Sequence, residues 1–154
     1  PLLSTVAVQD FLEQCQPLDC DFYYPIVTRE ASEKVFPGEK RTFISLKEGT
    51  FTGGNLFMVN PIHLEPLAPT IEQFLAYRKK PLKMVSLLGV GFVFSYFAKQ
   101  LSISQLEERF TKLLHVKARA VISSYPEIGF DVDKPSDLAL IREKLPVFWK
   151  GREE

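Results

Sequence analysis

The sequence has no excess of charge of either sign and no long hydrophobic run. Nineteen Lys and Arg residues balance nineteen Asp and Glu residues, so the chain lacks the basic field that would favour a nucleic acid or an anionic membrane. Its longest apolar stretch, from Val85 to Ala98, is shorter than the roughly 20 residues that a membrane-spanning helix needs. We therefore expect no nucleic-acid partner and no membrane partner.

Cysteine and export signals are also scarce. The two cysteines, Cys15 and Cys20, have no His or Cys neighbours at metal-binding spacing, and two cysteines do not make a disulfide framework. No charged segment followed by an apolar stretch and a cleavage site marks export, so we expect a cytoplasmic protein with free thiols. The chain begins with Pro1 instead of methionine, which suggests a fragment of a longer protein.

The composition is that of an ordinary globular domain. The 154 residues are 45% hydrophobic and 25% charged, and a chain of this length buries about two-thirds of its unfolded surface. Aromatic and β-branched segments alternate with segments whose apolar residues recur at helical spacing. This alternation predicts a layered α/β fold with a mixed sheet. Because no internal repeat or linker is present, we expect a single domain over residues 1–154.

The first predicted elements follow from apolar spacing and turn residues. A helix begins at Ser4 or Thr5, because either residue can cap the helically spaced apolar residues that come next. A strand over 21–28 contains Pro25, which we expect at an edge or a bulge because proline cannot donate to a ladder. The polar stretch over 31–39 is predicted to be a loop.

Later segments alternate in the same way. After residue 40 we predict a strand, a turn at 47–49, a second strand over 56–59, and a helix over 70–79 that follows Pro61 and Pro66. The last predicted elements are a buried helix over 84–101, an amphipathic helix over 106–114, a strand over 117–123, and a helix on Leu138, Ile141 and Leu145.

The segment Thr52-Gly53-Gly54-Asn55 is the first candidate for a binding site. Paired glycines allow positive φ and let backbone N–H groups approach a ligand closely, while Asn55 offers both a donor and an acceptor. Turn statistics also allow a plain β-bulge or tight turn at this position. The residues alone leave both interpretations open.

The segment from Asp131 to Leu138 is the second candidate. Asp131 and Asp133 follow a predicted strand and precede a predicted helix, and Mg²⁺ prefers a few carboxylate oxygens together with substrate phosphates. Alternatively, Asp133 caps the helix and Asp137 complements its dipole. Spacing alone does not separate the metal site from the cap.

Other chemistry finds little support in the residues. His63 and His115 are isolated, and no Ser or Cys stands in a nucleophile turn, so a hydrolase triad is not indicated. Short basic runs such as Lys40-Arg41 and 78–80 are usually solvated faces. We nevertheless name Arg41 as the candidate basic residue of a phosphate-binding site.

Two segments resemble the MobA-like nucleotidyltransferases, a family within the nucleotide-diphospho-sugar transferase superfamily. They are RTFISLKEGTFTGGNLFMVNP over 41–61 and YPEIGFDVDKPSDLALIREKL over 125–145, with the D-x-D-x-P-x-D-L signature in the second. The opening Pro1-Leu2-Leu3-Ser4 also resembles the segment directly after the Asp-x-Pro motif of that family. The resemblance covers nearly the whole chain, but only the second half of the family's domain.

The resemblance implies a three-layer Rossmann-like α/β unit of which this chain is the C-terminal portion. Asp133, with Asp131 next in line, would be the second ligand of Mg²⁺, and Thr52, Gly53, Gly54 and Asn55 would contact the acceptor. The glycine-rich loop that holds the nucleoside triphosphate and the first metal Asp would lie in an absent N-terminal half. The chain would then require that half, or self-associate, and would be inactive alone.

We therefore expect a Mg²⁺-dependent nucleotidyltransferase. As a whole protein it would transfer a nucleoside monophosphate from a nucleoside triphosphate to a phosphorylated or pterin-type acceptor and release pyrophosphate, with Asp133 as the main catalytic contributor. One alternative is a metal-dependent glycosyltransferase with Asp131-Val132-Asp133 as its D-x-D motif. Another is a non-catalytic interaction domain of the same fold.

Overall fold

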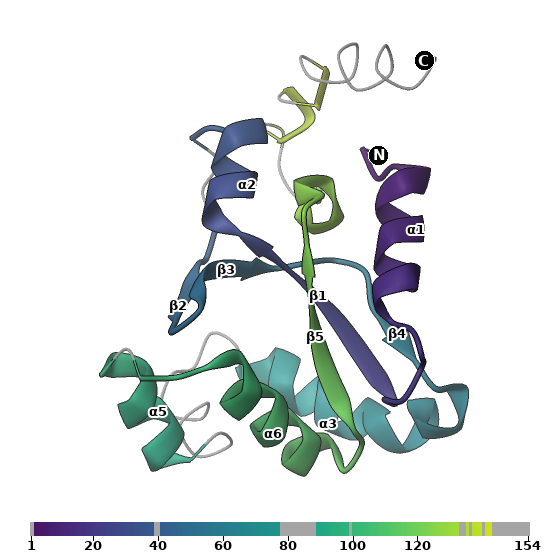
Figure 1. Cartoon of the computed structure of the whole chain (residues 1–154), viewed down its shortest axis with the longest axis vertical. Coiled ribbons are helices and arrows are strands. Elements are labelled where there is room, and N and C mark those ends of the chain that lie inside the picture. Colours follow the sequence, from purple (N-terminus) through teal and green to yellow (C-terminus); the bar gives the residue numbers. More distant parts are fainter. Residues whose placement is uncertain are drawn as a thin grey trace.

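The computed structural model describes residues 2–38, 41–77, 89–98, 100–132, 135, 137–139 and 141–142. Five strands form one mixed sheet, and helices lie toward both of its ends (Figure 1). The described elements, in chain order, are α1 (Thr5–Gln14), β1 (Phe22–Thr28), α2 (Arg29–Val35), β2 (Ile44–Leu46), β3 (Gly49–Gly53), β4 (Met58–Val59), the 3₁₀ turn η1 (Pro61–His63), α3 (Leu64–Tyr77), α5 (Val90–Phe97), α6 (Ile103–Leu114), β5 (Ala118–Ser123) and the 3₁₀ turn η2 (Pro126–Gly129). The predicted α/β class with a mixed sheet is confirmed.

Strand β1 is the centre of the sheet. Strand β5 runs parallel to it along one side, in register from Phe22 with Ala118 to Val27 with Ser123. On the other side β3 and β4 pair antiparallel with β1, β3 beside its last residues and β4 beside its first. Strand β2 adds to β3 as a hairpin. The gap between β3 and β4 therefore lies opposite the middle of β1.

This gap explains how Pro25 stands in the central strand, where we predicted only an edge or a bulge. The Pro25 carbonyl accepts a hydrogen bond from Gly54 N at 2.9 Å, so the backbone polar groups of Pro25 face the gap and not β5. Because the nitrogen and the carbonyl of one residue point to the same side of a strand, the missing N–H removes no bond of the parallel ladder. The edge prediction was wrong for this reason.

Helix α1 confirms the first predicted helix. The Ser4 side chain accepts from Ala7 N and caps its first turn. Ala7 and Phe11 are fully buried, and with Cys15 they pack against Tyr23, Val121 and Ile128 from the sheet and η2. The core under this helix thus joins both parallel strands to the turn after β5.

Two helices differ from the sequence prediction. Residues 31–35, predicted as loop, belong to α2, because Thr28 at the end of β1 accepts from Ala31 N and caps it. Helix α3 begins at Leu64 and not near residue 70, so Pro66 lies in its first turn, where the missing N–H has no partner within the helix. Pro69 is accommodated farther inside the same helix.

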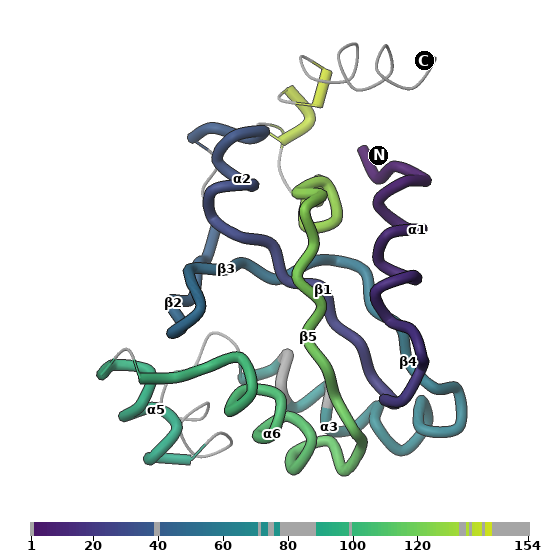
Figure 2. Tube along the Cα trace, in the orientation of Figure 1, coloured from purple at the N-terminus to yellow at the C-terminus, as the bar shows by residue number. Residues whose placement is uncertain are grey.

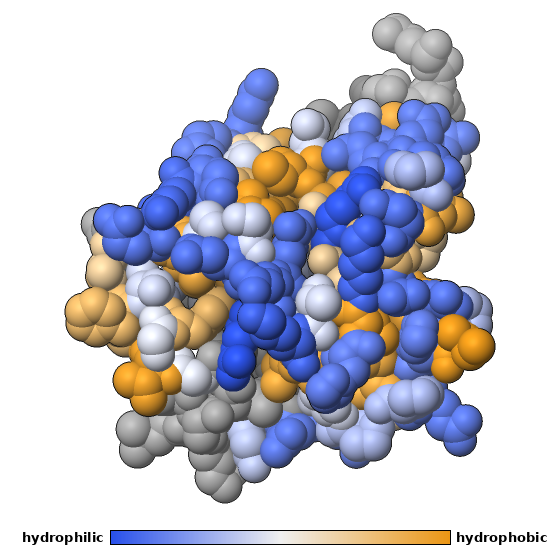
Figure 3. All heavy atoms as spheres, turned by 60° about the horizontal axis from the view of Figure 1, so that its bottom comes forward, coloured by the Kyte–Doolittle hydropathy of each residue, from blue (hydrophilic) through white to orange (hydrophobic). Residues whose placement is uncertain are grey.

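The apolar segment over 84–101 was predicted to be a buried helix, but the helix described there, α5, is half-buried on one side and exposed on the other, and only Leu101 beyond it is buried. Val90, Phe94 and Phe97 of α5 are each about three-quarters exposed, so the structure describes no element that covers them. Figure 3 shows apolar side chains reaching the surface in several places between hydrophilic ones. Residues 84–88 and 99 of the prediction lie outside the described residues. No helix in the described ranges is long and apolar enough to cross a membrane.

Helix α6 and strand β5 confirm the two predicted elements over 106–114 and 117–123. Side chains of α6 also close part of the outer edge of β5: Ala118 N donates to Thr111 Oγ1 at 3.0 Å, and Ala120 N donates to Glu107 Oε1 at 2.7 Å. Polar groups on a strand edge otherwise offer a template for pairing with another chain. The last predicted helix is described only in part, with helical residues at 135, 137–139 and 141–142.

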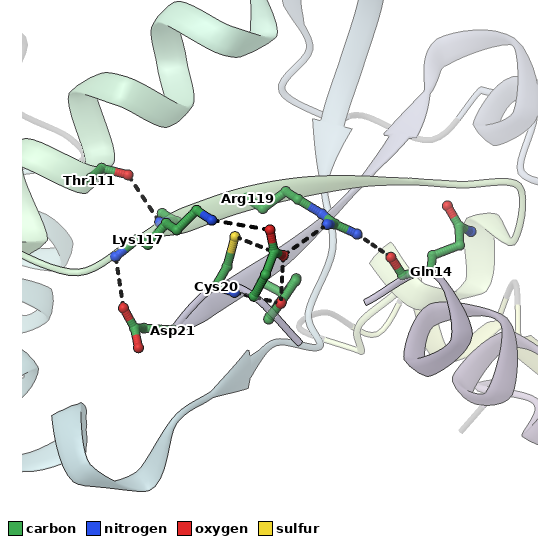
Figure 4. A network of polar contacts seen from close by, with 9 residues as sticks. Gln14, Cys20, Asp21, Thr111, Lys117 and Arg119 are labelled. Carbon is green, nitrogen blue, oxygen red and sulfur yellow. Dashed lines mark hydrogen bonds and ion pairs between the residues drawn. The ribbon is translucent and has the colours of Figure 1, made fainter. Parts of the chain in front are cut away.

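A polar network ties the turn before β1 to the start of β5 (Figure 4). Asp19 accepts from Lys117 Nζ at 3.1 Å and from Arg119 Nη1 at 3.3 Å, while Arg119 also donates to the Gln14 carbonyl at the end of α1. Asp21 accepts from Lys117 N at 3.0 Å. The hydrogen bond from Lys117 is the main cause that lowers the pKa of Asp19 below its ordinary value.

Asp19→Asn is expected to lower the melting temperature at neutral pH but not in acid. A carboxylate with a depressed pKa stabilises the fold above its unfolded pKa of about 4, and this contribution is lost as the pH falls through the lower folded pKa. The difference between wild type and variant should therefore vanish in acid and shrink in 0.5 M salt, because exposed pairs are screened. Melting curves at several pH values test this, and a constant difference across pH would contradict it.

Candidate functional site

The turn of Thr52 to Asn55 connects β3 to both β1 and η2. Gly54 N donates to the Pro25 carbonyl, and Asn55 N donates to the Ile128 carbonyl, both at 2.9 Å. The Asn55 side-chain amide donates to the Gly129 carbonyl at 3.0 Å. The backbone N–H groups of Gly54 and Asn55 are thus engaged within the protein, and the turn holds η2 against the sheet. Contact of this turn with an acceptor stays a prediction.

Close packing, and not positive φ, explains the glycine pair. Neither glycine is among the residues with positive φ. A Cβ on Gly53 would overlap the Tyr24 hydroxyl, and a Cβ on Gly54 would lie 2.7 Å from both Pro25 Cγ and Ile128 Cγ2. Each glycine therefore leaves room for one neighbouring side chain or more.

Arg41 lies at the same place. A Cβ on Gly129 would lie 2.7 Å from Arg41 Nη1 and 3.2 Å from the Gly53 carbonyl oxygen, so the guanidinium rests on Gly129 next to the turn. The structure thus brings Arg41 together with the predicted glycine turn, although 11 or more residues separate them along the chain. Of the turn, Thr52 and Gly54 are buried and Asn55 is exposed, and a guanidinium beside such a turn is suited to bind an anion.

Tyr24 belongs to this cluster, and sequence reasoning missed it. Its hydroxyl lies over Gly53, and burial raises the pKa of the phenol, while the charge of Arg41 partly offsets the increase. The phenol is thus a hydrogen-bond donor at neutral pH. The signal available in the sequence was the alternation of strand β1, which puts Tyr23 in the core and Tyr24 on the opposite face.

The acidic segment is described only in its first part. Asp131 is exposed and its Oδ1 accepts from Val132 N at 2.8 Å, whereas Asp133 lies outside the described residues. Asp137 is one of the described helical residues. Whether Asp133 caps that helix stays a prediction. No group of three His, Cys, Asp or Glu side chains that could hold a metal occurs within the described ranges.

The start of the chain packs against the same segment. Ser4 Oγ donates to Glu127 Oε1 at 2.8 Å, and both side chains are buried. Leu2 is buried with Phe130, and Val132 packs against their cluster. Figure 2 shows the first residues and the turn after β5 at the same end of the molecule. Residues immediately before Asp131 are therefore in contact with residues next to Pro1.

A separate hollow lies at the other end of β1. It has a volume of about 300 Å³ and is lined by Leu18, Cys20, Tyr23, Met58, Val59, Asn60 and Pro61. None of the predicted site residues lines it. We therefore place the candidate site at the glycine turn, Arg41, Tyr24 and the segment of Asp131.

Comparison with solved structures finds similarity to a protein from Thermus thermophilus that is described as a hypothetical transferase. The two chains are 39% identical, with a TM-score of 0.81, and the match covers 90% of this chain and 59% of the Thermus protein. The shared α/β fold confirms the predicted fold class, and the chain spans less than two-thirds of that protein's length. No protein-family model and no curated protein sequence matches the chain.

Proposed function

We propose that this chain is the acceptor-binding half of a Mg²⁺-dependent nucleotidyltransferase. The observation that carries the proposal is the packing of Leu2 and Ser4 against residues 127–132. An acidic residue just upstream of Pro1 in a longer chain would then be near Asp131. Similarity to a protein described as a transferase supports the class of reaction.

The donor chemistry fits a hard cation in part. Asp131 is an exposed carboxylate at the end of the turn after β5, and a cation such as Mg²⁺ binds through one or two carboxylates plus substrate phosphates. The described residues contain no group of three possible metal ligands, so Asp133 and a residue outside this chain would complete the set. When bound, the cation would neutralise charge on the triphosphate.

The residues of this chain would bind and orient the acceptor. An oxygen of the acceptor attacks the α-phosphorus of the nucleoside triphosphate, the bond to the β-phosphate oxygen breaks, and pyrophosphate leaves. In such transfer, positioning and electrostatic stabilisation provide most of the rate. Arg41 would hold the acceptor's phosphate, and the turn of Thr52 to Asn55 would form the wall beside it.

Pyrophosphate release tests the proposal directly. A longer protein that includes this sequence should release pyrophosphate only when Mg²⁺, a nucleoside triphosphate and an acceptor such as a sugar phosphate or a pterin are all present. The 154-residue chain alone should release none, because the triphosphate loop would lie outside it. Release of a nucleoside diphosphate from a nucleotide sugar would instead favour the D-x-D glycosyltransferase, and absence of any turnover would favour a non-catalytic domain.

The same proposal predicts a partner for the chain. We expect it to bind a separately supplied N-terminal half or to associate with itself, since missing neighbouring strands would leave apolar surface exposed. Light scattering with and without that half measures the association. A stable monomer that releases pyrophosphate unaided would contradict both expectations.

A further inference from the structure

The Tyr24 hydroxyl stands out because the glycine turn makes room for it. A Cβ at position 53 would lie 2.2 Å from the hydroxyl oxygen, so the hydroxyl keeps its place only beside glycine. Within the described part of the chain, this hydroxyl makes no hydrogen bond, while the Tyr23 hydroxyl beside it in sequence accepts from Cys20 N at 2.8 Å. Because the Tyr24 side chain is 37% exposed, its hydroxyl is available to donate to a bound molecule.

The surroundings of this hydroxyl favour an anion. The Arg41 charge acts on Tyr24, and the Arg41 guanidinium rests on Gly129, where a Cβ would lie 3.2 Å from the Gly53 carbonyl oxygen. Both donors therefore lie beside Gly53. A phenol O–H and a guanidinium N–H together are suited to bind two oxygens of one phosphoryl group.

An aromatic row extends from Tyr24 along the same face of the sheet. The Phe22 ring lies 6.5 Å from the Tyr24 ring at an interplanar angle of 11°, and 6.0 Å from the Phe57 ring at 28°. Tyr24 is 37% exposed and Phe57 is 54% exposed. Exposed aromatic rings beside a cation form a wall for a ligand that has an apolar or planar part and an anionic end.

We propose that the Tyr24 hydroxyl and the Arg41 guanidinium together bind the phosphoryl group of an organic phosphate monoester, whose organic part lies along Phe22, Tyr24 and Phe57. That this ligand is the acceptor of the transfer reaction rests on the proposed function. The proposal adds Tyr24 as a binding residue and limits the acceptor to a phosphate monoester with a ring or another apolar part.

Binding to the 154-residue chain tests the proposal without catalysis. Calorimetry with inorganic phosphate and with phenyl phosphate should show binding of both, with phenyl phosphate the tighter ligand. Tyr24→Phe, which keeps the ring and removes the hydroxyl, should weaken both about tenfold, the effect of losing one hydrogen bond to a charged group. Tyr96→Phe removes a phenol from α5 and should leave both affinities unchanged.

Gly53→Ala gives a second and independent variant. The added Cβ would displace the Tyr24 hydroxyl and should therefore weaken phosphate binding. The fold should stay intact, because the contact falls on the end of the Tyr24 side chain, which can move. Wild-type affinity in Tyr24→Phe, or no binding of either probe, would overturn the proposal. Equal affinity for the two probes would overturn the role of the aromatic row.

The two proposals fail separately. Tyr24-dependent phosphate binding in this chain, together with no pyrophosphate release by the longer protein, would contradict the nucleotidyltransferase and leave the binding site in place. Pyrophosphate release that is insensitive to Tyr24→Phe, with an unchanged KM for the acceptor, would contradict the binding site alone.

Discussion

Asp133→Asn in the longer protein is expected to lower turnover at least about 100-fold, the usual size of losing a preorganised electrostatic contact. Asparagine keeps the shape of the side chain and removes its charge, so the fold should stay intact. The loss should appear in kcat more than in the KM of the acceptor, because the charge would act on the reacting phosphates. Pyrophosphate release and thermal unfolding, measured on the same preparation, check both parts.

Two further variants give this experiment its controls. Asp131→Asn should have a smaller effect, because one Asp131 oxygen already accepts from Val132 N. Asp137→Asn removes the same charge within the helical residues that come after Asp133 and should leave turnover nearly unchanged. If Asp133→Asn instead lowers stability by about 1 kcal/mol and retains its turnover, Asp133 is a helix cap and not a metal ligand.

Strongly periodic segments were predictable from the sequence because local spacing alone determines them. Helix α1 has a capping Ser4 and regularly spaced apolar residues, and α6 has a capping box of Ser102 and Gln105. The exposure of α5 was not predictable. Its apolar residues satisfy any rule for a core helix, but burial depends on which other element packs against them, and that is a property of the tertiary fold.

The position of Pro25 was also not predictable from local sequence rules. Local rules place Pro25 at a sheet edge, but the offset between β3 and β4 creates a position in the central strand that needs no donor. The offset comes from the turn at Gly53 and Gly54, which lies 28 or more residues away in the sequence. No local pattern near Pro25 carries this information.

The candidate site was predictable in its residue types and not in its contacts. The glycine pair, Arg41 and Asp131 could be singled out by their chemistry. Tyr24 could not, because its interest comes from lying over Gly53 on a neighbouring strand. The contact of Ser4 with Glu127 joins residues 123 apart, and it links the start of the chain to the segment that leads to Asp131.

Gly54→Ala is expected to lower the free energy of unfolding by about 1–3 kcal/mol, the usual cost of overpacking a core. The added Cβ would lie 2.7 Å from Pro25 Cγ and from Ile128 Cγ2, and 3.2 Å from the Pro25 carbonyl oxygen. Pro25 is fixed in the central strand and Ile128 is buried in η2, so neither can move without loosening the hydrogen bonds that hold the turn. Urea unfolding curves measure the loss.

Matched glycine variants separate this packing cost from the general effect of replacing glycine. Gly91→Ala in α5 meets nothing within 4 Å and should be neutral or slightly stabilising, because alanine favours a helix over glycine. Gly53→Ala should cost less than Gly54→Ala, since its closest contact is the end of the Tyr24 side chain and not a rigid neighbour. If all three variants unfold at the same urea concentration as wild type, Pro25 and Ile128 do not confine Gly54. The turn would then not be a fixed link between β1 and η2, and the arrangement of Tyr24, Arg41 and Gly129 would not depend on it.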